Sequence, residues 1–450
     1  MPADSAVSDL ADNYFTEGFM MKEIRIKDTK CNFEGEQFIR PFGFKGDYVT
    51  ESRQTVSLIQ SSSGQLGLGL CTQSVLWSDP AVFAAHGEAA GGDRMFETQQ
   101  YALEQLKGMS FTNPIELLES IIPDVHEQGK KITGRSDLRL TFTLNSLVGV
   151  DNALWMLYAK ENNLTNFDAV LPDQYHPALS DRHDLLAAIP LMAYGVPLDE
   201  IKSAVAEGYF FLKIKIGADP DKDGDLDKML AWDKSRVEQI HKLVGQVRIK
   251  YTDHGKIPYY FDANGRYDSK ERLNKFLDHT RKIGAFDQIM IVEEPFPEEM
   301  EQDVGDLGVR IAADESAHSD KDAIKRIQMG YGAIALKPIA KTMSMSLKIA
   351  KIAHDANIPC FCADLTVNPI LVDWNKNIAA RLAPLPGMTI GALESNGHQN
   401  YKRWDQMLRY HPCYGADWIK PSQGLFHLND NFYDRSGGIF EISEHYRNLV

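Results

Sequence analysis

Five short apolar segments that end in charged side chains decide the fold of this chain: FFLKIKIG (210–217), YYFDANG (259–265), IMIVEEP (289–295), IAADES (311–316) and AIALKP (333–338). They belong to a series of apolar runs that alternate with amphipathic stretches. Strands that alternate with helices pair in parallel through right-handed crossovers. The series therefore predicts an α/β fold, a modified (β/α)8 barrel of the TIM type, with an open doubly wound sheet as the competing architecture.

The series comprises eight strand candidates. They are 189–193, 210–216, 259–262, 288–293, 309–313, 333–336, 359–363 and 388–393. A doubly wound sheet that binds nucleotides usually carries a phosphate loop, but the glycine-rich segment at 64–69 reads GQLGLG and does not fit G-x-G-x-x-G. This difference favours the barrel.

The rest of the chain divides around this barrel. Residues 1–20 are expected to be a polar lead, and residues 21–180 an α+β domain in which strand patterns give way to helical spacing. The barrel is assigned to residues 181–397. The aromatic-rich segment 398–450, with a strand expected at 438–442, is predicted to pack on the first domain.

Composition narrows the class of protein. Among 450 residues, 48 Lys and Arg stand against 63 Asp and Glu, a formal net charge of −15. Such a balance argues against a nucleic-acid partner, and no apolar run approaches the length of a membrane span. Acids stand near the first residue where a signal peptide has a basic region, and the five cysteines are scattered. We therefore expect a cytoplasmic protein that contacts neither nucleic acid nor membrane.

Carboxylates end three consecutive strand candidates. Asp262, Glu293 and Asp314 are 31 and 21 residues apart, intervals that fit one strand–helix unit each. Separately, each acid could simply cap a helix. Converging acids repel one another unless a hard cation lies between them, and oxygen ligands suit Mg²⁺ or, as a substitute, Mn²⁺. Lys213 and Lys215 share one face of their strand, where acids bridged by a cation are natural partners.

The ordered motifs K-x-K, D-x-N, E-E-P, A-D-E-S and L-K-P resemble the enolase superfamily, and within it the muconate lactonizing enzyme-like subgroup with paired lysines. LVGVDNALWMLYAKENN at 147–163 is similar to the helix that precedes the barrel in that family. The resemblance implies a (β/α)7β barrel preceded by an α+β capping domain. It also implies that substrate specificity depends on mobile capping loops, here 40–48.

The resemblance assigns roles to individual residues. Asp262, Glu293 and Asp314 match the metal ligands, with the neighbouring carboxylates of Glu294 and Glu315 as alternatives. Lys215 and Lys337 match the acid/base pair on opposite faces of the substrate, and Lys213 matches an auxiliary lysine that stabilises charge. Asp364 and Glu394 are candidate substrate contacts, with a structural role as the alternative.

These roles imply Mg²⁺-dependent removal of a proton α to a substrate carboxylate. The resulting enediolate concentrates negative charge that a cation and an ammonium group stabilise, and burial beside a cation lowers a lysine pKa so that the amine can act as a base. We expect a racemase, epimerase or cycloisomerase that acts on a small carboxylate and forms a homo-oligomer. A carboxylate dehydratase and a non-catalytic metal-binding barrel are the alternatives.

The chain departs from two related patterns. The Asp and His that mandelate racemase-like enzymes carry on strands six and seven are replaced by Lys337 and by the segment CFCAD at 360–364. The Asp-x-Asp typical of dipeptide epimerases is replaced by ESN at 394–396. Both departures leave the substrate undecided.

Overall fold

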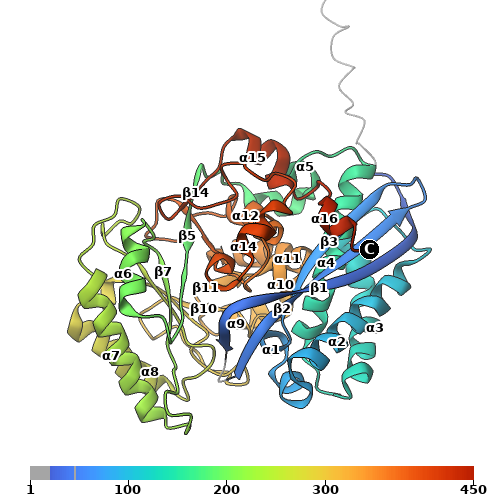
Figure 1. Ribbon diagram of the computed structural model, residues 1–450. Coiled ribbons are helices and arrows are strands. Elements are labelled where there is room, and N and C mark those ends of the chain that lie inside the picture. Colours follow the sequence, from blue (N-terminus) through green and yellow to red (C-terminus); the bar gives the residue numbers. More distant parts are fainter. Residues whose placement is uncertain (1–20, 45–46) are drawn as a thin grey trace, which may run out of the picture.

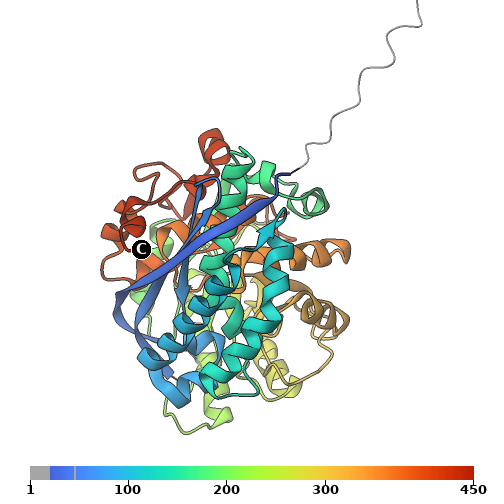
Figure 2. The same ribbon diagram turned by 90° about the vertical axis from the view of Figure 1, so that its right-hand side faces the viewer.

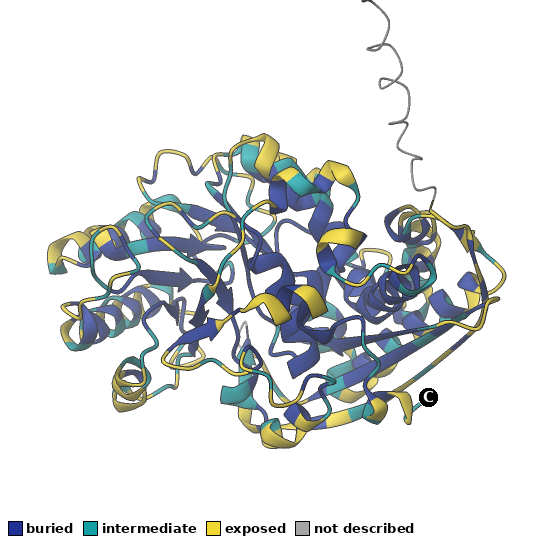
Figure 3. Ribbon diagram, turned by 90° about the horizontal axis from the view of Figure 1, so that it is seen from above, coloured by how far each residue is buried: buried dark blue, intermediate teal, exposed yellow. Residues whose placement is uncertain are grey.

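Two sheets organise the chain, an antiparallel one in the N-terminal part and a curled parallel one in the C-terminal part (Figure 1). The computed structural model describes residues 21–44 and 47–450, so the lead expected at 1–20 lies outside the described residues. The parallel strands are buried, and helices with exposed outer faces surround them (Figure 3). The predicted modified barrel with an α+β N-terminal domain is confirmed.

The antiparallel sheet has the strand order β3-β2-β1-β4. Its strands are β1 (Ile24–Phe44), β2 (Asp47–Ser61), β3 (Leu66–Gln73) and β4 (Ser110–Phe111). β1 and β2 form a long hairpin whose register shifts between Gln37 and Phe42. Helices α2 (Pro80–Leu106), α3 (Pro114–Thr133) and α4 (Leu140–Glu161) pack against this sheet (Figure 2). The other helices of the domain are α1 (Val75–Ser78), α5 (Phe167–Val170) and the 3-10 helix η1 (Asp173–Leu179).

Glycines allow α4 to approach the sheet closely. A Cβ atom on Gly67 would lie 2.0 Å from the carbonyl oxygen of Ala153, and one on Gly69 would lie 1.9 Å from that of Gly149. Any side chain at either position would overlap the helix backbone. The glycine-rich segment at 64–69 therefore serves helix packing.

Helix α4 also joins the two domains. Asp151 accepts hydrogen bonds from the backbone N–H and the hydroxyl of Ser344, at 2.9 and 2.6 Å, and the indole of Trp155 donates to the same hydroxyl at 3.0 Å. Because Ser344 belongs to α11 (Met343–Asp355), which follows the sixth barrel strand, these bonds fix the N-terminal domain against the barrel.

The parallel sheet closes on itself through its first strand. Pro190 divides that strand into β5 (Leu185–Ile189) and β6 (Leu191–Met192), since a proline cannot donate a ladder hydrogen bond. β5 pairs with β13 (Gly391–Glu394), and β6 pairs with β7 (Leu212–Lys215). Strands β7 to β13 follow one another in sequence order around the sheet, and the remaining members are β8 (Tyr259–Asp262), β9 (Ile289–Glu293), β10 (Ile311–Ala313), β11 (Ala333–Leu336) and β12 (Cys360–Cys362).

Each of the eight predicted strands overlaps a strand of this barrel. The connecting elements are α6 (Leu198–Ala206), α7 (Leu226–Val244), α8 (Lys270–Ile283), η2 (Phe286–Gln288), α9 (Asp320–Gln328), α10 (Pro338–Lys341), α11 and α12 (Pro369–Ala379). Residues 294–310, all of them described, form a helix-free loop between β9 and β10. Within the described ranges, no helix combines the length and apolarity that a membrane crossing requires.

Local signals set the helix ends. The side chain of Ser269 accepts a hydrogen bond at the start of α8, and Gly284 ends that helix in the left-handed conformation at φ +78°. Helix α9 begins with a capping box between Ser319 and Asp322. Such caps fix where each strand ends and the next helix begins, and therefore where the charged strand ends point.

The C-terminal segment contacts both domains. β14 (Leu425–His427) pairs antiparallel with β5, while the Arg403 guanidinium lies 2.8 Å from the carboxylate of buried Glu36 on β1. The strand predicted at 438–442 is wrong, because Gly437 and Gly438 take positive φ and turn the backbone. The short elements of this segment are α13 (Gly397–Asn400), α14 (Trp404–Arg409), α15 (Asp430–Arg435), η3 (Ser436–Gly438) and α16 (Glu444–Arg447).

Candidate active site

The carboxyl ends of neighbouring strands bring the predicted site residues to one rim of the barrel. The sheet register pairs Lys215 with Asp262, Asp262 with Glu293, and Glu293 with Ala312, two residues before Asp314. Parallel strands place such ends side by side. The predicted lysines and acids are all buried at this rim.

Lys213 lies at the centre of the ion-pair network. Its Nζ atom is 3.1 Å from Asp262, 3.2 Å from Glu293 and 3.0 Å from Glu394. Lys215 Nζ lies 2.6 Å from Asp262 and also donates to the side-chain oxygen of Asn264. Acids on three strands therefore share one ammonium group, and Asp262 is contacted by two.

Lys337 contributes a third cation, on the other side of the barrel. It forms an ion pair with Asp314, and its Nζ lies 4.8 Å from the ring centre of Trp77 in the N-terminal domain. Lys341, at the end of α10, lies 3.2 Å from the same carboxylate and also donates to the Asp314 carbonyl oxygen. Two lysines separated by one helical turn therefore fix Asp314.

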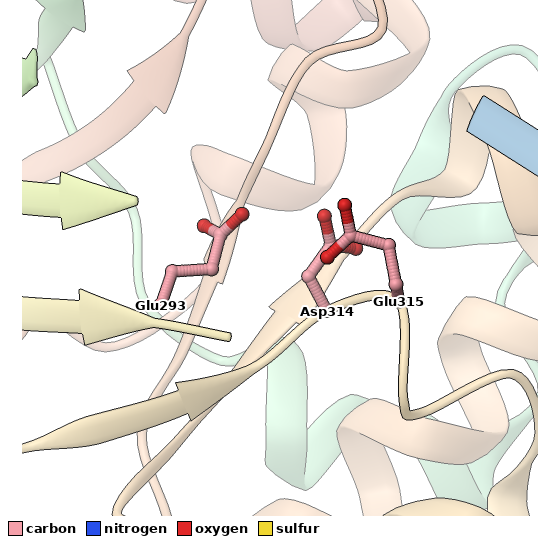
Figure 4. Close-up of side chains that lie close together, drawn as sticks. All are labelled: Glu293, Asp314 and Glu315. Carbon is pink, nitrogen blue, oxygen red and sulfur yellow. The ribbon is translucent and has the colours of Figure 1, made fainter. Parts of the chain in front are cut away.

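Three carboxylates turn toward one another beside these lysines. Each of Glu293, Asp314 and Glu315 offers an oxygen, and those three atoms lie within 4.8 Å of one another (Figure 4). Glu315 accepts a hydrogen bond of 2.9 Å from the Asn264 amide, and its other oxygen is buried without a partner among the described residues. The cluster thus consists of two predicted ligands, Glu293 and Asp314, together with Glu315. The third predicted ligand, Asp262, lies outside the cluster and is linked to Glu293 through Lys213.

The buried charges of the site do not balance. Four lysines face seven carboxyl groups, which leaves a formal excess of three negative charges. The residues are Lys213, Lys215, Lys337 and Lys341 against Asp262, Glu293, Glu294, Asp314, Glu315, Asp364 and Glu394. Buried charge is unfavourable unless it is compensated. Clustered carboxylate oxygens with a negative excess fit a hard divalent cation such as Mg²⁺.

Burial and neighbouring charges set the pKa values of the cluster in opposite directions. Burial raises the pKa of Asp314, but Lys337 and Lys341 outweigh it and hold that pKa below its usual range. At Glu293, burial and the charge of Asp314 outweigh Lys213, so the pKa lies above its usual range. The lowering expected from burial is outweighed at Lys337 by Asp314 and Glu315, which raise its pKa.

The Glu294 side chain binds backbone N–H groups of the neighbouring loop. Its Oε1 accepts hydrogen bonds from the N–H groups of Asp314 and Ser316, at 2.7 and 3.0 Å. Its own backbone has φ +38°, in the left-handed region, which turns the chain after Glu293. Glu294 therefore shapes the loop that carries Asp314 and Glu315.

The candidate substrate contacts Asp364 and Glu394 are tied to neighbouring groups. The Asp364 carboxylate accepts from the backbone N–H groups of Leu365 and Asn396 at 2.8 Å each. Glu394 accepts from the Asp364 N–H at 3.0 Å as well as from Lys213. Burial and then Glu394 raise the pKa of Asp364 to about 7. Both side chains border the site, and their part in binding a substrate stays a prediction.

Two side chains of this network, Asn264 and Lys341, were not among the residues predicted for the site. Asn264 links Lys215 to Glu315, and its place two residues after Asp262 in D-x-N was the available signal. Lys341 was not singled out, although its spacing of four from Lys337 would place both lysines on one face of a helix.

A cavity opens above this rim, between the two domains. Lys215, Lys337 and Glu315 border it from the barrel, and Phe44 and Trp77 border it from the N-terminal domain. A small molecule in this cavity would therefore contact both lysines and the carboxylate cluster at once.

Comparison with known proteins relates the barrel to a family. Residues 198–407 match the family model described as "Enolase C-terminal domain-like". A search of curated protein sequences finds no match.

Solved structures share the fold across most of the chain. A dipeptide epimerase from Enterococcus faecalis V583, complexed with Mg and the dipeptide L-Leu-L-Tyr, is 18% identical, with a TM-score of 0.62 over 90% of this chain and 97% of that one. The L-Ala-D/L-Glu epimerase from Bacillus subtilis is 17% identical, with a TM-score of 0.62 over 90% of this chain and 96% of that one. The N-succinyl Arg/Lys racemase from Bacillus cereus ATCC 14579 is 14% identical, with a TM-score of 0.62 over 90% of this chain and 93% of that one.

At these identities the structural likeness shows the fold alone. The family-model match covers the barrel strands from β7 to β13, which carry the lysines and acids of the site. Residues 198–407 therefore form an enolase C-terminal domain-like barrel, and the solved structures share the fold over about nine tenths of the chain.

Proposed function

We propose that this protein removes and returns a proton at the carbon next to the carboxylate of a small molecule, as a racemase or epimerase. One observation carries the proposal: Lys215 and Lys337 border the same cavity from strand ends that lie four positions apart in the eight-strand ring. Half a ring separates them, so they approach a bound molecule from opposite sides. The proposal places the chain in the paired-lysine subgroup.

The carboxylates of the site suit a Mg²⁺ ion, with Mn²⁺ as a substitute. We assign the ion to Asp262, Glu293 and Asp314, with Glu315 as a further ligand because its oxygen belongs to the same cluster. The bound ion would neutralise the substrate carboxylate and the negative charge that develops on its oxygens.

The lysines carry the proton in two steps. The neutral amine of Lys215 accepts the α-proton, and the electron pair of the broken C–H bond moves into the carboxylate to give an enediolate. The ammonium group of Lys337 then donates a proton to the opposite face of the same carbon, and the configuration is inverted. The roles of the two lysines reverse for the other enantiomer.

Lys213 supports these steps through charge. Its ammonium group lies within 3.2 Å of Asp262, Glu293 and Glu394, so it holds the carboxylates of three strands in place. The Asn264 side chain fixes the amine of Lys215 in the cavity, which positions it for proton transfer.

The printed names of the solved relatives support this class of reaction. Two of them are epimerases of dipeptides, one of which was crystallised with Mg, and a third is a racemase of N-succinyl arginine and lysine. All three names describe inversion at one carbon atom. A cycloisomerase or a dehydratase would need the same first step but only one of the two lysines.

Exchange of the α-hydrogen with deuterated solvent tests the proposal. The protein is incubated with Mg²⁺ and with both enantiomers of a panel of α-substituted carboxylates. We expect exchange with inversion for the wild type and no inversion for Lys215→Ala or Lys337→Ala, each of which can still exchange one enantiomer. Lys202→Ala, which removes an exposed lysine, is the control.

The panel also separates the alternatives. Loss of all exchange in one variant and full activity in the other would favour a one-base cycloisomerase or dehydratase. Absence of exchange with every acid, despite tight Mg²⁺ binding, would favour a binding protein.

A further inference from the structure

The wall that the N-terminal domain contributes to the cavity is mostly apolar. Aromatic and branched side chains of the β1–β2 hairpin and of helices α1 and α2 face the cavity there, and the set comprises Phe38, Phe42, Phe44, Val49, Trp77 and Phe83. The barrel side of the same cavity is charged. A molecule that fills this space therefore meets polar groups at one end and an apolar surface at the other.

Aromatic rings of this wall lie over both proposed proton-transfer groups. Lys337 Nζ is 4.8 Å from the ring centre of Trp77, and Lys215 Nζ is 5.6 Å from that of Phe44. A ring face attracts a nearby ammonium group and excludes water. The carbon atom between the two lysines therefore lies against aromatic surfaces, and its substituent extends toward the apolar wall.

The charged groups that border this wall have partners or face solvent. The Arg53 guanidinium lies 2.9 Å from Asp93, which pairs its charge, although its Nη1 atom is buried without a hydrogen-bond partner among the described residues. Glu88 accepts hydrogen bonds from the backbone N–H and the hydroxyl of Thr50. Glu51 is exposed. A charged substituent that moves from water into the cavity would find no matched partner of opposite charge on this wall, and its binding is therefore disfavoured.

Two buried donors of the wall, Arg53 Nη1 and Trp77 Nε1, lack a hydrogen-bond partner among the described residues, and the second belongs to the ring that lies over Lys337. Trp77 is only 5% exposed. Buried donors are nearly always matched by an acceptor. Because the Trp77 ring lies over Lys337, an acceptor that meets this N–H belongs next to the reacting carbon.

We infer that the substrate is a carboxylate whose α-substituent is large, uncharged and apolar, and that an oxygen close to the reacting carbon accepts a hydrogen bond from Trp77. This inference rests on the proposed function, because it places the reacting carbon between Lys215 and Lys337. It makes Trp77 and Phe83 specificity-determining residues, contributed by the N-terminal domain.

A matched series of N-acetyl amino acids tests the inference, because all members share the carboxylate and an amide oxygen and differ only in the side chain. With Mg²⁺, kcat/KM for deuterium exchange is expected to be at least about tenfold higher for the phenylalanine and leucine derivatives than for the alanine derivative. The arginine and glutamate derivatives are expected to be slower still. Rates for either charged derivative that match the phenylalanine derivative would overturn the inference.

Two variants examine the wall directly. Trp77→Phe keeps a ring over Lys337 but removes the N–H, and it is expected to lower kcat/KM about tenfold for every member of the series. Phe83→Ala is expected to lower the phenylalanine-to-alanine preference. Ile39→Ala, an exposed position on the same hairpin, is the control. An unchanged preference in Phe83→Ala together with an unchanged rate in Trp77→Phe would refute the wall as a specificity surface.

Calorimetric binding of the same acids separates this inference from the proposed function. Tight binding of the apolar derivatives without any exchange would contradict the proposed function and support the inference. Exchange that favours charged derivatives would support the proposed function and overturn the inference. An absence of binding across the series would also overturn the inference.

Discussion

Replacing Lys213 by methionine removes an ammonium group that contacts three buried carboxylates, at 3.1, 3.2 and 3.0 Å. At an effective dielectric constant of about 20, each contact at this distance is worth about 5 kcal/mol of gross Coulomb energy. The variant also avoids the cost of burying the ammonium, several kcal/mol. We therefore expect a net loss of about 3–5 kcal/mol in the free energy of unfolding, the range for breaking a buried ion pair.

Urea unfolding followed by circular dichroism measures this loss, first without divalent cations and then with Mg²⁺. Because a bound cation neutralises the same carboxylates, the difference between wild type and Lys213→Met is expected to shrink when Mg²⁺ is added. Lys202→Met, at an exposed position, serves as the control. A loss below about 1 kcal/mol without Mg²⁺ would refute the conclusion that Lys213 holds the three acids together.

Three further outcomes follow from the structure. Gly69→Ala would place a Cβ atom 1.9 Å from a carbonyl oxygen of α4, so urea unfolding should show a loss of about 1–3 kcal/mol or more, whereas Gly195→Ala, with no atom within 4 Å, should be neutral. Burial raises the pKa of Asp233 to about 7, so the folded state binds this proton more tightly than the unfolded state and stability is lost as pH rises from about 4 to about 7. Asp233→Asn, which cannot ionise, should therefore gain in urea midpoint relative to wild type between pH 5 and pH 8, and an equal pH dependence of both proteins would contradict this. Glu315→Gln should weaken Mn²⁺ binding, measured by electron paramagnetic resonance, about tenfold or more, and an unchanged affinity would restrict the ligands to the three acids predicted from sequence.

The strands of the barrel were predictable because their pattern is local. A buried parallel strand needs a short apolar run, and a following amphipathic stretch supplies the helix that covers it. All eight runs overlap barrel strands, although a helix-free loop follows the run at 288–293 in place of a helix. The strand expected at 438–442 failed because Gly437 and Gly438 take positive φ, which the apolar pattern does not reveal. The antiparallel strand β14 was not anticipated, because its partner β5 lies more than 200 residues earlier in the sequence.

Strand alternation predicted side-chain directions only as far as the strands extend. Alternation along β7 placed Lys213 and Lys215 on one face, and the register aligned Lys215, Asp262 and Glu293. Beyond the strand ends, alternation no longer applies. Glu294, at φ +38°, turns back to backbone N–H groups, and no sequence pattern distinguishes it from Glu315, which joins the carboxylate cluster.

The sequence by itself determined the order of charged residues at the strand ends and, through the parallel barrel, their meeting on one rim. Tertiary structure alone decided which neighbouring acid faces the cluster, that Lys341 and Asn264 complete the network, and that rings from the N-terminal domain cover the lysines. The physical reason is range. Strand and helix periodicity follow from nearest neighbours in the chain, whereas loop dihedral angles and contacts between domains depend on residues that only the folded state brings together.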